Sequence, residues 1–486
     1  MITDLKPYPA YKDSGLPWLG NIPEHWEMHR GKILFHCIDI RSSTGEEELL
    51  TVSSSRGVIP RSSTSVTMFK ADSYKGYKLC WPGDLVINSL WAWGRGLGVS
   101  QYHGIVSSAY GVYRLFPQYA NYSAYIHELV RSTPFNWELQ VRSKGIWISR
   151  LQLTDDAFLG IKFPIPPYRE QLAIIRFIKF IDRHIGHNIL AKQKLIRLFE
   201  EEKHAIINHA INCGSNTTAW FKTTGGGRLE RQPEREGFEF EERANRQNQN
   251  LTKLSKIAII IDCLHKTPEY VDNGYPMVRI SDINGSELDL KRCKRISEEN
   301  FNIFSKSHQP KLGDIIISRV GTIGEISIVG SNDPFCLGQN TAFIIPKSSN
   351  QYLFFALKSS CVKEQIDDAV VGSTLQTLSL DDIKKIKIPF YSENRNKQIS
   401  QCLNKKYNCL IKLDFSINQS IKLLYELRAR LVSDMVTGKL DTRIAAARLP
   451  VDFEEELEIF DNTELLTNDK EYFDIMNPDT KIDNHE

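Results

Sequence analysis

The sequence predicts an α+β fold: two strand-rich globules with pseudo-two-fold symmetry, joined by two long antiparallel helices that form a coiled-coil spacer. Three observations predict this fold. A turn-and-strand motif occurs twice, a long stretch without proline follows each copy, and a narrow apolar seam runs along both stretches. The 486 residues are 41% hydrophobic and 25% charged, an ordinary globular composition.

The repeat is clearest at two places in the chain. Residues 81–89 (WPGDLVINS) match residues 311–319 (KLGDIIISR) at an offset of 230, and both copies predict a turn that leads into a buried strand. Residues 161–164 (IKFP) match residues 386–389 (IKIP) at an offset of 225. Matches in the same order at nearly the same offset indicate that one globule-plus-helix unit has been duplicated.

Each proline-free stretch predicts a long helix with one apolar seam. The predicted seams are Ile174, Ile178, Ile181, Ile185, Asn188, Lys192, Leu195, Phe199, Glu202 and Ile206 in the first helix, and Leu403, Tyr407, Leu410, Asp414, Ile417, Ile421, Leu424, Arg428, Leu431 and Met435 in the second. A 40-residue helix is about 60 Å long, more than the core of either globule requires, so we expect the two seams to pair. The alternative is that each helix packs only on its own globule, which would require a wider apolar face.

These patterns divide the chain into six segments. They are a first globule at 1–168, a first spacer helix at 169–211, a linker at 212–250 that we expect to be flexible, a second globule at 251–392, a second spacer helix at 393–440, and an acidic C-terminal tail at 441–486. From residue 449 onward, 13 acidic residues stand against 2 basic ones, a net charge of −11. Because the whole chain carries +2, the remainder carries +13, a basic excess that suits a polyanionic partner.

The sequence also argues against several classes of protein. No apolar run approaches the roughly 20 residues that span a bilayer, and the N-terminus is polar, so we expect a cytoplasmic chain with no membrane partner. The nine cysteines are dispersed without metal-site spacing and are expected to be reduced thiols. Phosphate-loop, HExxH, GxSxG and Rossmann signatures are absent, so we expect no catalytic residue, no cofactor and no metal.

Aromatic and polar residues that cluster with glycines are the candidate DNA-binding residues. Arg, Asn and Gln can read base edges with two hydrogen bonds, whereas Lys and Ser mainly contact phosphates. The candidates are Arg56, Arg61, Trp91, Trp93, Arg95, Gln101, Tyr102 and Lys144 in the first globule, and His265, Lys266, Arg279, Arg319, Thr322, Gln339, Asn340 and Gln376 in the second. Structural alternatives remain open: Trp91 and Trp93 could belong to a core, and Arg319 could pair with Asp314.

Several segments resemble those of type I restriction-modification specificity subunits. Residues 11–26 are similar to the N-terminal signature of such subunits, while residues 167–171 (PYREQ) and 436–440 (VTGKL) fit the start of the first helix and the end of the second. Residues 88–93 with 104–110 look like one class of target-recognition domain, and residues 262–283 with 318–324 look like another. Two features depart from the pattern: the second half has no copy of residues 18–26, and Pro389 is followed by FYSEN instead of a Pro-Pro-x-x-Glu-Gln run.

The resemblance implies two target-recognition domains, each reading one half of a split asymmetric site on double-stranded DNA. It implies that two antiparallel helices set the gap between the half-sites and dock two methyltransferase subunits, and that the restriction (translocase) subunits join this core. It also implies that the chain itself performs no chemistry.

Two other functions remain open from the residues alone. A non-DNA scaffold would use the coiled coil to join two protein-binding globules, and it would lack the steep fall of DNA affinity with salt that phosphate contacts produce. A nuclease would use dispersed carboxylates such as Asp314 and Glu325, and the isolated chain would cleave DNA with magnesium.

Overall fold

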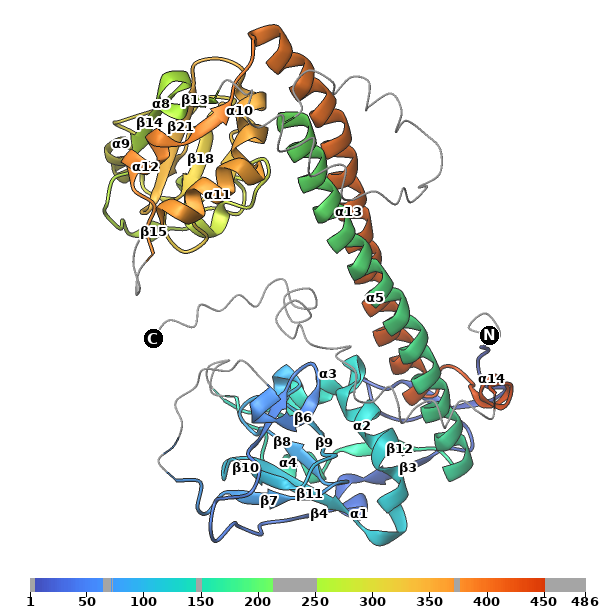
Figure 1. The fold of residues 1–486 in the computed structure, drawn as a ribbon. Helices are drawn as coiled ribbons and strands as arrows, with labels where there is room; N and C mark the ends of the chain where they lie inside the picture. Colours follow the sequence, from blue (N-terminus) through green and yellow to red (C-terminus); the bar gives the residue numbers. More distant parts are fainter. Residues whose placement is uncertain are drawn as a thin grey trace. The chain divides into compact units, whose positions relative to one another are not determined.

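The structure is a computed structural model, and it describes residues 5–63, 71, 73–145, 151–212, 251–370 and 376–450. The expected flexible linker, apart from Asn212, and the tail beyond Pro450 lie outside these residues. The chain forms two compact units, residues 1–193 with 418–486 (unit 1) and residues 194–417 (unit 2). Each unit therefore contains one globule and a part of both long helices (Figure 1). None of the helices in the described ranges is both long enough and apolar enough to cross a membrane.

Unit 1 contains short strands, short helices and one end of each long helix. Its strands are β1 Tyr11–Asp13, β2 Asn21–Pro23, β3 Glu27–Arg30, β4 Phe35–Cys37, β5 Leu50–Ser53, β6 Gly57–Pro60, β7 Lys78–Cys80, β8 Leu85–Ile87, β9 Leu97–Val99, β10 Gly104–Val106, β11 Gly111–Leu115 and β12 Lys162–Ile165. Its helices are α1 Gly31–Leu34, α2 Ser123–Arg131, α3 Thr133–Arg142, α4 Asp155–Leu159 and α14 Arg443–Ala447, with 3-10 turns η2 Arg61–Ser63, η3 Ala92–Gly94 and η4 Pro117–Tyr122.

A four-stranded antiparallel sheet in the order β4-β11-β8-β9 lies at the centre of the unit 1 globule. The other strands form two-stranded pairs, including β3 with β12 and the β5–β6 hairpin. The central strand β8 (LVI) is buried on both faces, as expected for a continuous β-branched and aliphatic run. Apolar side chains such as Val86 and Val112 join one core with Leu50 and Val58 of the hairpin.

Unit 2 repeats the central sheet of unit 1 but differs in the elements around it. Its strands are β13 Leu251–Lys253, β14 Ala258–Asp262, β15 Tyr270–Val271, β16 Tyr275–Val278, β17 Lys294–Ile296, β18 Ile315–Ser318, β19 Ile326–Ile328, β20 Cys336–Leu337, β21 Thr341–Pro346 and β22 Lys387–Pro389. Its helices are α8 Leu254–Ile257, α9 Glu298–Phe304, α10 Asn350–Leu357, α11 Ser360–Ala369 and α12 Leu380–Lys385, with one 3-10 turn, η6 Ile280–Asp282.

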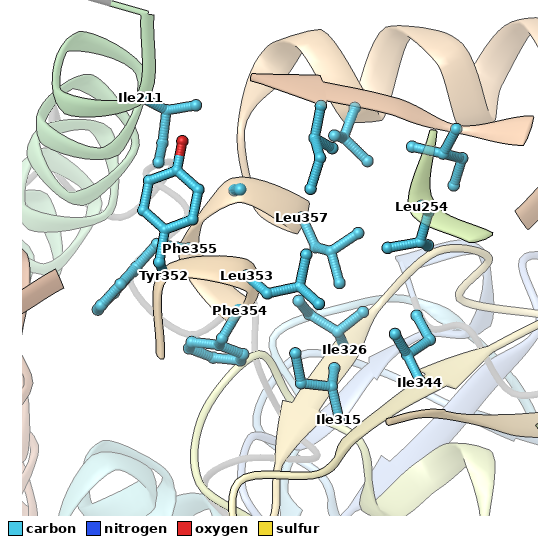
Figure 2. Packing of buried hydrophobic residues seen from close by; sticks show 14 of the residues in the cluster. Ile211, Leu254, Ile315, Ile326, Ile344, Tyr352, Leu353, Phe354, Phe355 and Leu357 are labelled. Carbon is cyan, nitrogen blue, oxygen red and sulfur yellow. The ribbon is translucent and has the colours of Figure 1, made fainter. Parts of the chain in front are cut away.

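The central sheet of unit 2 has the order β14-β21-β18-β19, the same topology as in unit 1. One core cluster of its described residues joins sheet residues such as Ile315 and Ile344 to the aromatic side chains of α10 and to Ile211 of the first long helix (Figure 2). Among the described residues, unit 2 has a second four-stranded sheet, β15-β17-β16-β20, without a counterpart in unit 1. The first long helix thus contributes directly to the core of the unit 2 globule.

Hydrogen bonds at equivalent positions show that the duplication extends to side chains. The Tyr125 hydroxyl donates to the Pro164 carbonyl at 3.0 Å, and the Tyr352 hydroxyl donates to the Pro389 carbonyl at 2.7 Å. Both tyrosines belong to corresponding helices, α2 and α10, and both prolines to corresponding strands, β12 and β22. The predicted α+β fold with two related globules is confirmed.

The two long helices are α5 Tyr168–Asn212 and α13 Glu393–Val436, and they run antiparallel within each unit (Figure 1). In unit 2, Lys203 Nζ donates to Asp414 Oδ2 at 2.7 Å, and further along α5 the Ile211 carbonyl accepts from the Tyr391 hydroxyl at 2.9 Å. In unit 1, Arg428 donates to Asp182 through Nε at 2.6 Å and through Nη2 at 2.9 Å. The expected pairing of the helices is confirmed.

The predicted seam of α13 agrees with the structure, whereas the seam of α5 shifts by one position at its middle. All ten predicted α13 positions are buried or half-buried. In α5, Asn188, Leu195 and Glu202 are exposed. The next residues along the helix are buried or half-buried instead: Ile189, Ile196 and Lys203. A straight α-helix has 3.6 residues per turn, so a strict seven-residue repeat drifts off the contact face, and the prediction at these positions was wrong.

The N-terminal segment of unit 1 packs against the end of α13. The backbones of Lys6 and Asp441 form a β-bridge, and the Tyr11 hydroxyl donates to the Lys439 carbonyl at 3.2 Å. Gly438 has φ +77°, and a Cβ there would lie 2.4 Å from Pro23 and 3.1 Å from the Trp26 ring. Only glycine fits this position without displacing the N-terminal segment, which explains why glycine ends the second helix here.

Glu170, in the first turn of α5, anchors that N-terminal segment. Its carboxylate accepts from Trp26 Nε1 and lies the same distance, 2.8 Å, from His25 Nε2, and it also accepts from the Tyr8 hydroxyl. The equivalent position of α13, at an offset of 225, is Arg395. The second half has no copy of residues 18–26, so a glutamate at this position would have no tryptophan to bind. This is a physical reason why the start of α13 lacks the Glu-Gln pair found at the start of α5.

Candidate nucleic-acid interface

One edge of the central sheet of unit 1 carries long loops. Ile87, at the end of β8, pairs with Leu97 at the start of β9 and with Gly111 at the start of β11, so three strand ends meet there. We call this the loop edge of unit 1. The turn between β8 and β9 at this edge contains Trp91, Trp93 and Arg95.

The β8–β9 turn has a defined geometry around its two tryptophans. The rings of Trp91 and Trp93 lie 4.9 Å apart, and Trp91 is 40% exposed, so it is not a core residue. A Cβ at Gly94 would lie 2.7 Å from Trp91 Nε1, and a Cβ at Gly96 would lie 2.8 Å from the Trp91 carbonyl oxygen and 3.0 Å from its ring. Arg95 adopts φ 62° and donates from Nη2 to Thr133 Oγ1 at 2.9 Å. The glycines therefore serve to pack Trp91 against its own turn, and Arg95 joins the turn to α3.

Arg131 fixes the β5–β6 turn, which contains Arg56, beside the loop edge of unit 1. Its guanidinium donates to the carbonyls of Leu97 at 2.8 Å and Ser54 at 2.9 Å. Burial is the larger cause that lowers the pKa of the adjacent His127 to about 3, and the charge of Arg131 is the second cause. The imidazole is therefore neutral, and it accepts a hydrogen bond from the Val99 N–H at 3.2 Å. Arg56 thus belongs to the same surface as Arg95, and Arg61 lies at the far end of β6.

Two of the unit 1 candidates lie at the opposite edge of the sheet. Gln101 and Tyr102 follow the end of β9, beside the turn that precedes β8, where the Gly83 N–H donates to the Ser100 carbonyl at 2.8 Å. Lys144, in contrast, pairs with Gln152 in a β-bridge, and Leu153 donates to the carbonyl of Ser89 at the loop edge. The structure therefore groups Lys144 with Trp91, Trp93 and Arg95, and separates Gln101 and Tyr102 from them.

The loop edge of unit 2 is built by the equivalent strand ends. Ala342, at the start of β21, pairs with Asp262 at the end of β14 and with Ile317 near the end of β18. Residues 263–269, 319–325 and 338–340 form the loops at this edge. His265, Lys266, Thr322 and Gln339 are exposed there, while Asn340 turns the chain with φ 63°. Gln376 precedes Thr377, which pairs with Val320 of the same edge.

Arg319 is held by other groups of unit 2. Its Nη1 donates to Asp262 Oδ1 at 2.6 Å, its Nε donates to the Leu378 carbonyl at 3.0 Å, and its side chain is 17% exposed. Asp262 also faces His265 Nε2 at 3.2 Å. The suggested pairing of Arg319 with Asp314 was wrong, because Asp314 lies at the other end of β18 and contacts His308 Nε2 at 2.7 Å.

A hollow of about 290 Å³ opens at the loop edge of unit 2. Its lining combines apolar and polar side chains: Lys266, Thr267, Pro268, Tyr270, Met277, Arg279, Ile280, Ser281, Gly338 and Gln339. Gln339 Nε2 lies 2.6 Å from Thr267 Oγ1, so one half of its amide is engaged. Arg279 Nε is 3.3 Å from Asp282 Oδ2. The hollow brings together three of the predicted residues, Lys266, Arg279 and Gln339.

Two groups of reactive side chains in the described part of unit 2 bear on the nuclease and metal-site alternatives. Asp314 precedes β18 and Glu325 follows it, so the strand separates the two carboxylates of the nuclease alternative. Asp262, Cys263 and His265 place possible ligand atoms within 4.8 Å of one another. Asp262 is already paired with Arg319, and burial raises the pKa of the Cys263 thiol, which favours its protonated form over the thiolate that binds metals.

Three groups that hold these loop edges had no signal in the sequence. Arg131 and Asp262 act on partners more than 30 residues away, and Thr267 meets Gln339 across 72 residues. Periodicity and motif spacing report only local neighbours, so these pairings could not be inferred. The glycine-flanked tryptophans, in contrast, were visible as a cluster.

The second globule matches the family model of the type I restriction modification DNA specificity domain over residues 247–423. Among curated proteins, the chain is 22% identical over 173 residues to the EcoBI type I restriction enzyme specificity subunit of Escherichia coli, covering 35% of this chain and 36% of that protein. It is 22% identical over 311 residues to the MjaVIII specificity subunit of Methanocaldococcus jannaschii, covering 62% of this chain and 67% of that protein. The match therefore spans about a third of the first relative and two thirds of the second.

A solved structure supports the fold. It concerns complex assembly and conformational transition of the type I R-M system, and one of its chains superposes with a TM-score of 0.51 at 16% identity, over 85% of this chain and 98% of that chain. This likeness concerns the fold alone. The chain is similar to type I restriction-modification specificity subunits, and its match to the family model covers residues 247–423.

Proposed function

We propose that this chain selects the DNA site of a type I restriction-modification complex. The loop edge of unit 1 reads one half of a bipartite asymmetric site, and the loop edge of unit 2 reads the other half. The observation that supports this proposal is the equivalence of the two edges. The same strand ends carry loops with exposed side chains in both units: Trp91 and Lys144 in unit 1, and His265, Lys266 and Gln339 in unit 2. The side chains differ between the units, so the two half-sites differ in sequence.

Different groups at each edge have different roles in this proposal. In unit 1, Arg56, Arg95 and Lys144 supply positive charge around Trp91 and Trp93, which suits phosphate and base contacts from one surface. In unit 2, Lys266, Arg279 and Gln339 line the hollow, and His265, Thr322, Asn340 and Gln376 surround it. Arg319 holds the edge together through Asp262, so we assign it a structural role.

The long helices offer surfaces for partner subunits. In unit 2, Leu195, Leu198, Leu413 and Phe415 are 43%, 47%, 43% and 66% exposed. In unit 1, Leu190, Leu423 and Leu427 are 36%, 62% and 41% exposed. An apolar set on the helices of each unit fits two copies of one partner, which in this family is the methyltransferase subunit, with the restriction subunits joining that core.

The chain supplies recognition and no chemistry in this proposal. Methylation of adenine and cleavage of DNA then belong to the partner subunits, and the purified chain alone neither methylates nor cuts DNA. Methyl transfer or magnesium-dependent cleavage by the isolated chain would overturn this assignment.

Single-molecule methylome sequencing of cells with and without this gene tests the proposal directly. We expect one bipartite, asymmetric, adenine-methylated motif that disappears with the gene. A salt titration of purified chain plus methyltransferase provides the second test, because each phosphate contact should contribute a slope of about −0.9 to log K against log salt. An unchanged methylome together with a flat salt dependence would instead favour the protein scaffold.

A further inference from the structure

Helix α3 of unit 1 exposes large apolar side chains beside the loop edge. Trp137 is 63% exposed and Val141, one turn later, is 77% exposed. Gln140 Nε2 donates to the Trp93 carbonyl at 3.4 Å, which places this side of the helix next to the β8–β9 turn. We call the surface formed by Trp137, Gln140 and Val141 the α3 face. Trp137 and Val141 lie one helical turn apart, so their exposed side chains form one apolar patch, and contiguous patches on soluble proteins are candidate interaction surfaces.

The equivalent helix of unit 2, α11, shows that the fold does not require this apolar face. Both helices begin after a serine whose hydroxyl donates to the carbonyl three residues earlier: Ser132 to Leu129 and Ser359 to Ala356. At the same offset of 227, buried Phe135 and Leu139 correspond to buried Val362 and Ile366. The core-facing side of the two helices is therefore equivalent.

The outward side of the two helices has opposite character. At the offset of 227, exposed Glu364 and Asp368 of α11 correspond to Trp137 and Val141 of α3. An occupant that is both acidic and apolar would bind the α3 face and be repelled by α11. The occupant is consequently expected on unit 1 alone.

The chain contains a segment with this chemistry after Pro450. Residues 451–486 carry a net charge of −11, and aromatic and aliphatic residues are interspersed among the acids: Phe453, Leu457, Ile459, Phe460, Leu465, Leu466, Tyr472, Phe473, Ile475 and Met476. The rest of unit 1 carries +9, whereas residues 194–417 carry +4. Charge complementarity thus favours unit 1 as the binding surface for this segment.

The start of this segment is fixed on unit 1. Arg176 Nη2 donates to the Leu449 carbonyl at 3.3 Å and to the Pro450 carbonyl at 2.9 Å. The 36 residues that follow can extend over roughly 120 Å, which exceeds the diameter of a globule of this size. The segment can therefore reach the α3 face without leaving its own unit.

We propose that residues 451–486 dock on the α3 face of unit 1 and compete there with DNA. The apolar side chains of the segment cover Trp137 and Val141, and its carboxylates approach the basic side chains of the adjoining loop edge. The competition rests on the proposed function, whereas the docking does not. The segment then acts as a built-in restraint on recognition by unit 1, and a duplex that fits the site displaces it.

Hydrogen exchange tests the docking without DNA. We expect the amides of α3 to exchange at least threefold more slowly in the full chain than in a chain that ends at Pro450, with the difference falling as salt rises. The double substitution Trp137→Ser, Val141→Ser should remove this protection in the full chain. Ile33→Ser, at a 47% exposed residue outside the face, is the matched control and should retain it. Equal exchange of α3 in the full and shortened chains would overturn the proposal.

DNA affinity separates tail docking from a direct role of Trp137. DNA affinity is measured with the partner methyltransferase and a duplex that carries the methylated motif. At low salt, Trp137→Ser should raise the DNA affinity of the full chain about tenfold and leave the DNA affinity of the shortened chain unchanged. Weaker binding in both chains would make Trp137 a DNA contact and refute the docking. Self-association of the shortened chain in sedimentation, reversed by Trp137→Ser, would identify a second copy as the occupant and also refute it. If no variant binds DNA, the proposed function is refuted. The hydrogen exchange of the α3 amides then shows by itself whether the segment docks on the α3 face.

Discussion

Lys358 Nζ donates a hydrogen bond to the hydroxyl oxygen of Tyr407 at 2.7 Å and links α10 of the unit 2 globule to α13. The same ammonium group donates to the carbonyl of Gly285, which has φ +75°. In unit 1 the equivalent residue at an offset of 227 is Arg131, which binds the carbonyls that precede Gly57, with φ +77°. A cation at the end of one helix therefore holds a glycine turn in both units, but only the lysine can lose its charge near neutral pH.

The buried ammonium group of Lys358 makes the stability of unit 2 depend on pH. Burial lowers its pKa from 10.5 to about 8. Between pH 8 and 10.5, Lys358 is protonated in the unfolded chain and largely neutral in the folded chain. The free energy of unfolding should therefore rise with pH over this range, by up to about 3 kcal/mol. Urea unfolding of the natural chain and of Lys358→Met across this range measures the effect as the difference between the two slopes. Identical slopes would show that Lys358 does not titrate in this range.

The Lys203–Asp414 pair should be costly to break from one side. Lys203 is 7% exposed, and its Nζ lies 2.7 Å from Asp414 Oδ2. Asp414→Ala leaves a buried ammonium group with only the more exposed Glu200, so we expect a loss of about 2–4 kcal/mol in unfolding free energy. The double variant Lys203→Met, Asp414→Leu should recover most of it. Asp381→Ala, at an exposed pair, is the control and should change stability by less than about 0.5 kcal/mol. A double variant no more stable than Asp414→Ala would contradict this account.

Removing the Glu170 carboxylate should release the N-terminal segment. Glu170→Ala leaves the Trp26 N–H and the Tyr8 hydroxyl buried without their acceptor, a loss of about 2–4 kcal/mol. Limited proteolysis should then cut within residues 5–26 faster than in the natural chain. Arg395→Ala, at the equivalent position of α13, should have no such effect. An unchanged cleavage rate in Glu170→Ala would mean that contacts with residues 437–441 suffice to hold the segment.

Gln339 and Arg319 should behave differently although both lie at the loop edge of unit 2. Gln339→Ala removes an exposed amide and should relax only the base positions that this unit reads, at about 1–3 kcal/mol. Arg319→Ala leaves Asp262 without its partner and should weaken binding to all sequences and lower stability. Binding to a library of sites with single base changes, measured alongside thermal unfolding, distinguishes the two. The matched unit 1 variant, Arg95→Ala, should affect the other half-site.

The predictable part of the fold is the part that local pattern determines. The α13 seam from Leu403 to Met435 could be read correctly because its apolar positions stay on one face over the whole helix. The α5 seam was predicted wrongly at Asn188, because a strict seven-residue repeat selects Asn188 although the next residue, Ile189, is apolar and is the one that is buried. The antiparallel pairing followed from two seams of similar length in one chain.

The sequence could predict which types of residue form the candidate interface, but it could not predict which of them lie at the same edge of the sheet. Trp91, Trp93 and Arg95 were found together because glycines flank them in one short turn. Tyr102 was grouped with them by proximity in sequence, yet the three residues of β9 carry it to the opposite edge of the sheet. Arg319 looked available for bases because its partner, Asp262, lies 57 residues earlier in the chain.

The contact between the N-terminal segment and the end of α13 has a consequence for synthesis on the ribosome. Unit 2 is one continuous stretch, residues 194–417, and all of it is translated before the last part of α13. Unit 1 must wait, because Gly438 covers Trp26, and the Tyr125 hydroxyl needs the Val436 carbonyl, 2.9 Å away. The globule that is made first is therefore the one completed last, and a chain that lacks residues 418 onward would contain all of the second unit but a first unit with an uncovered tryptophan.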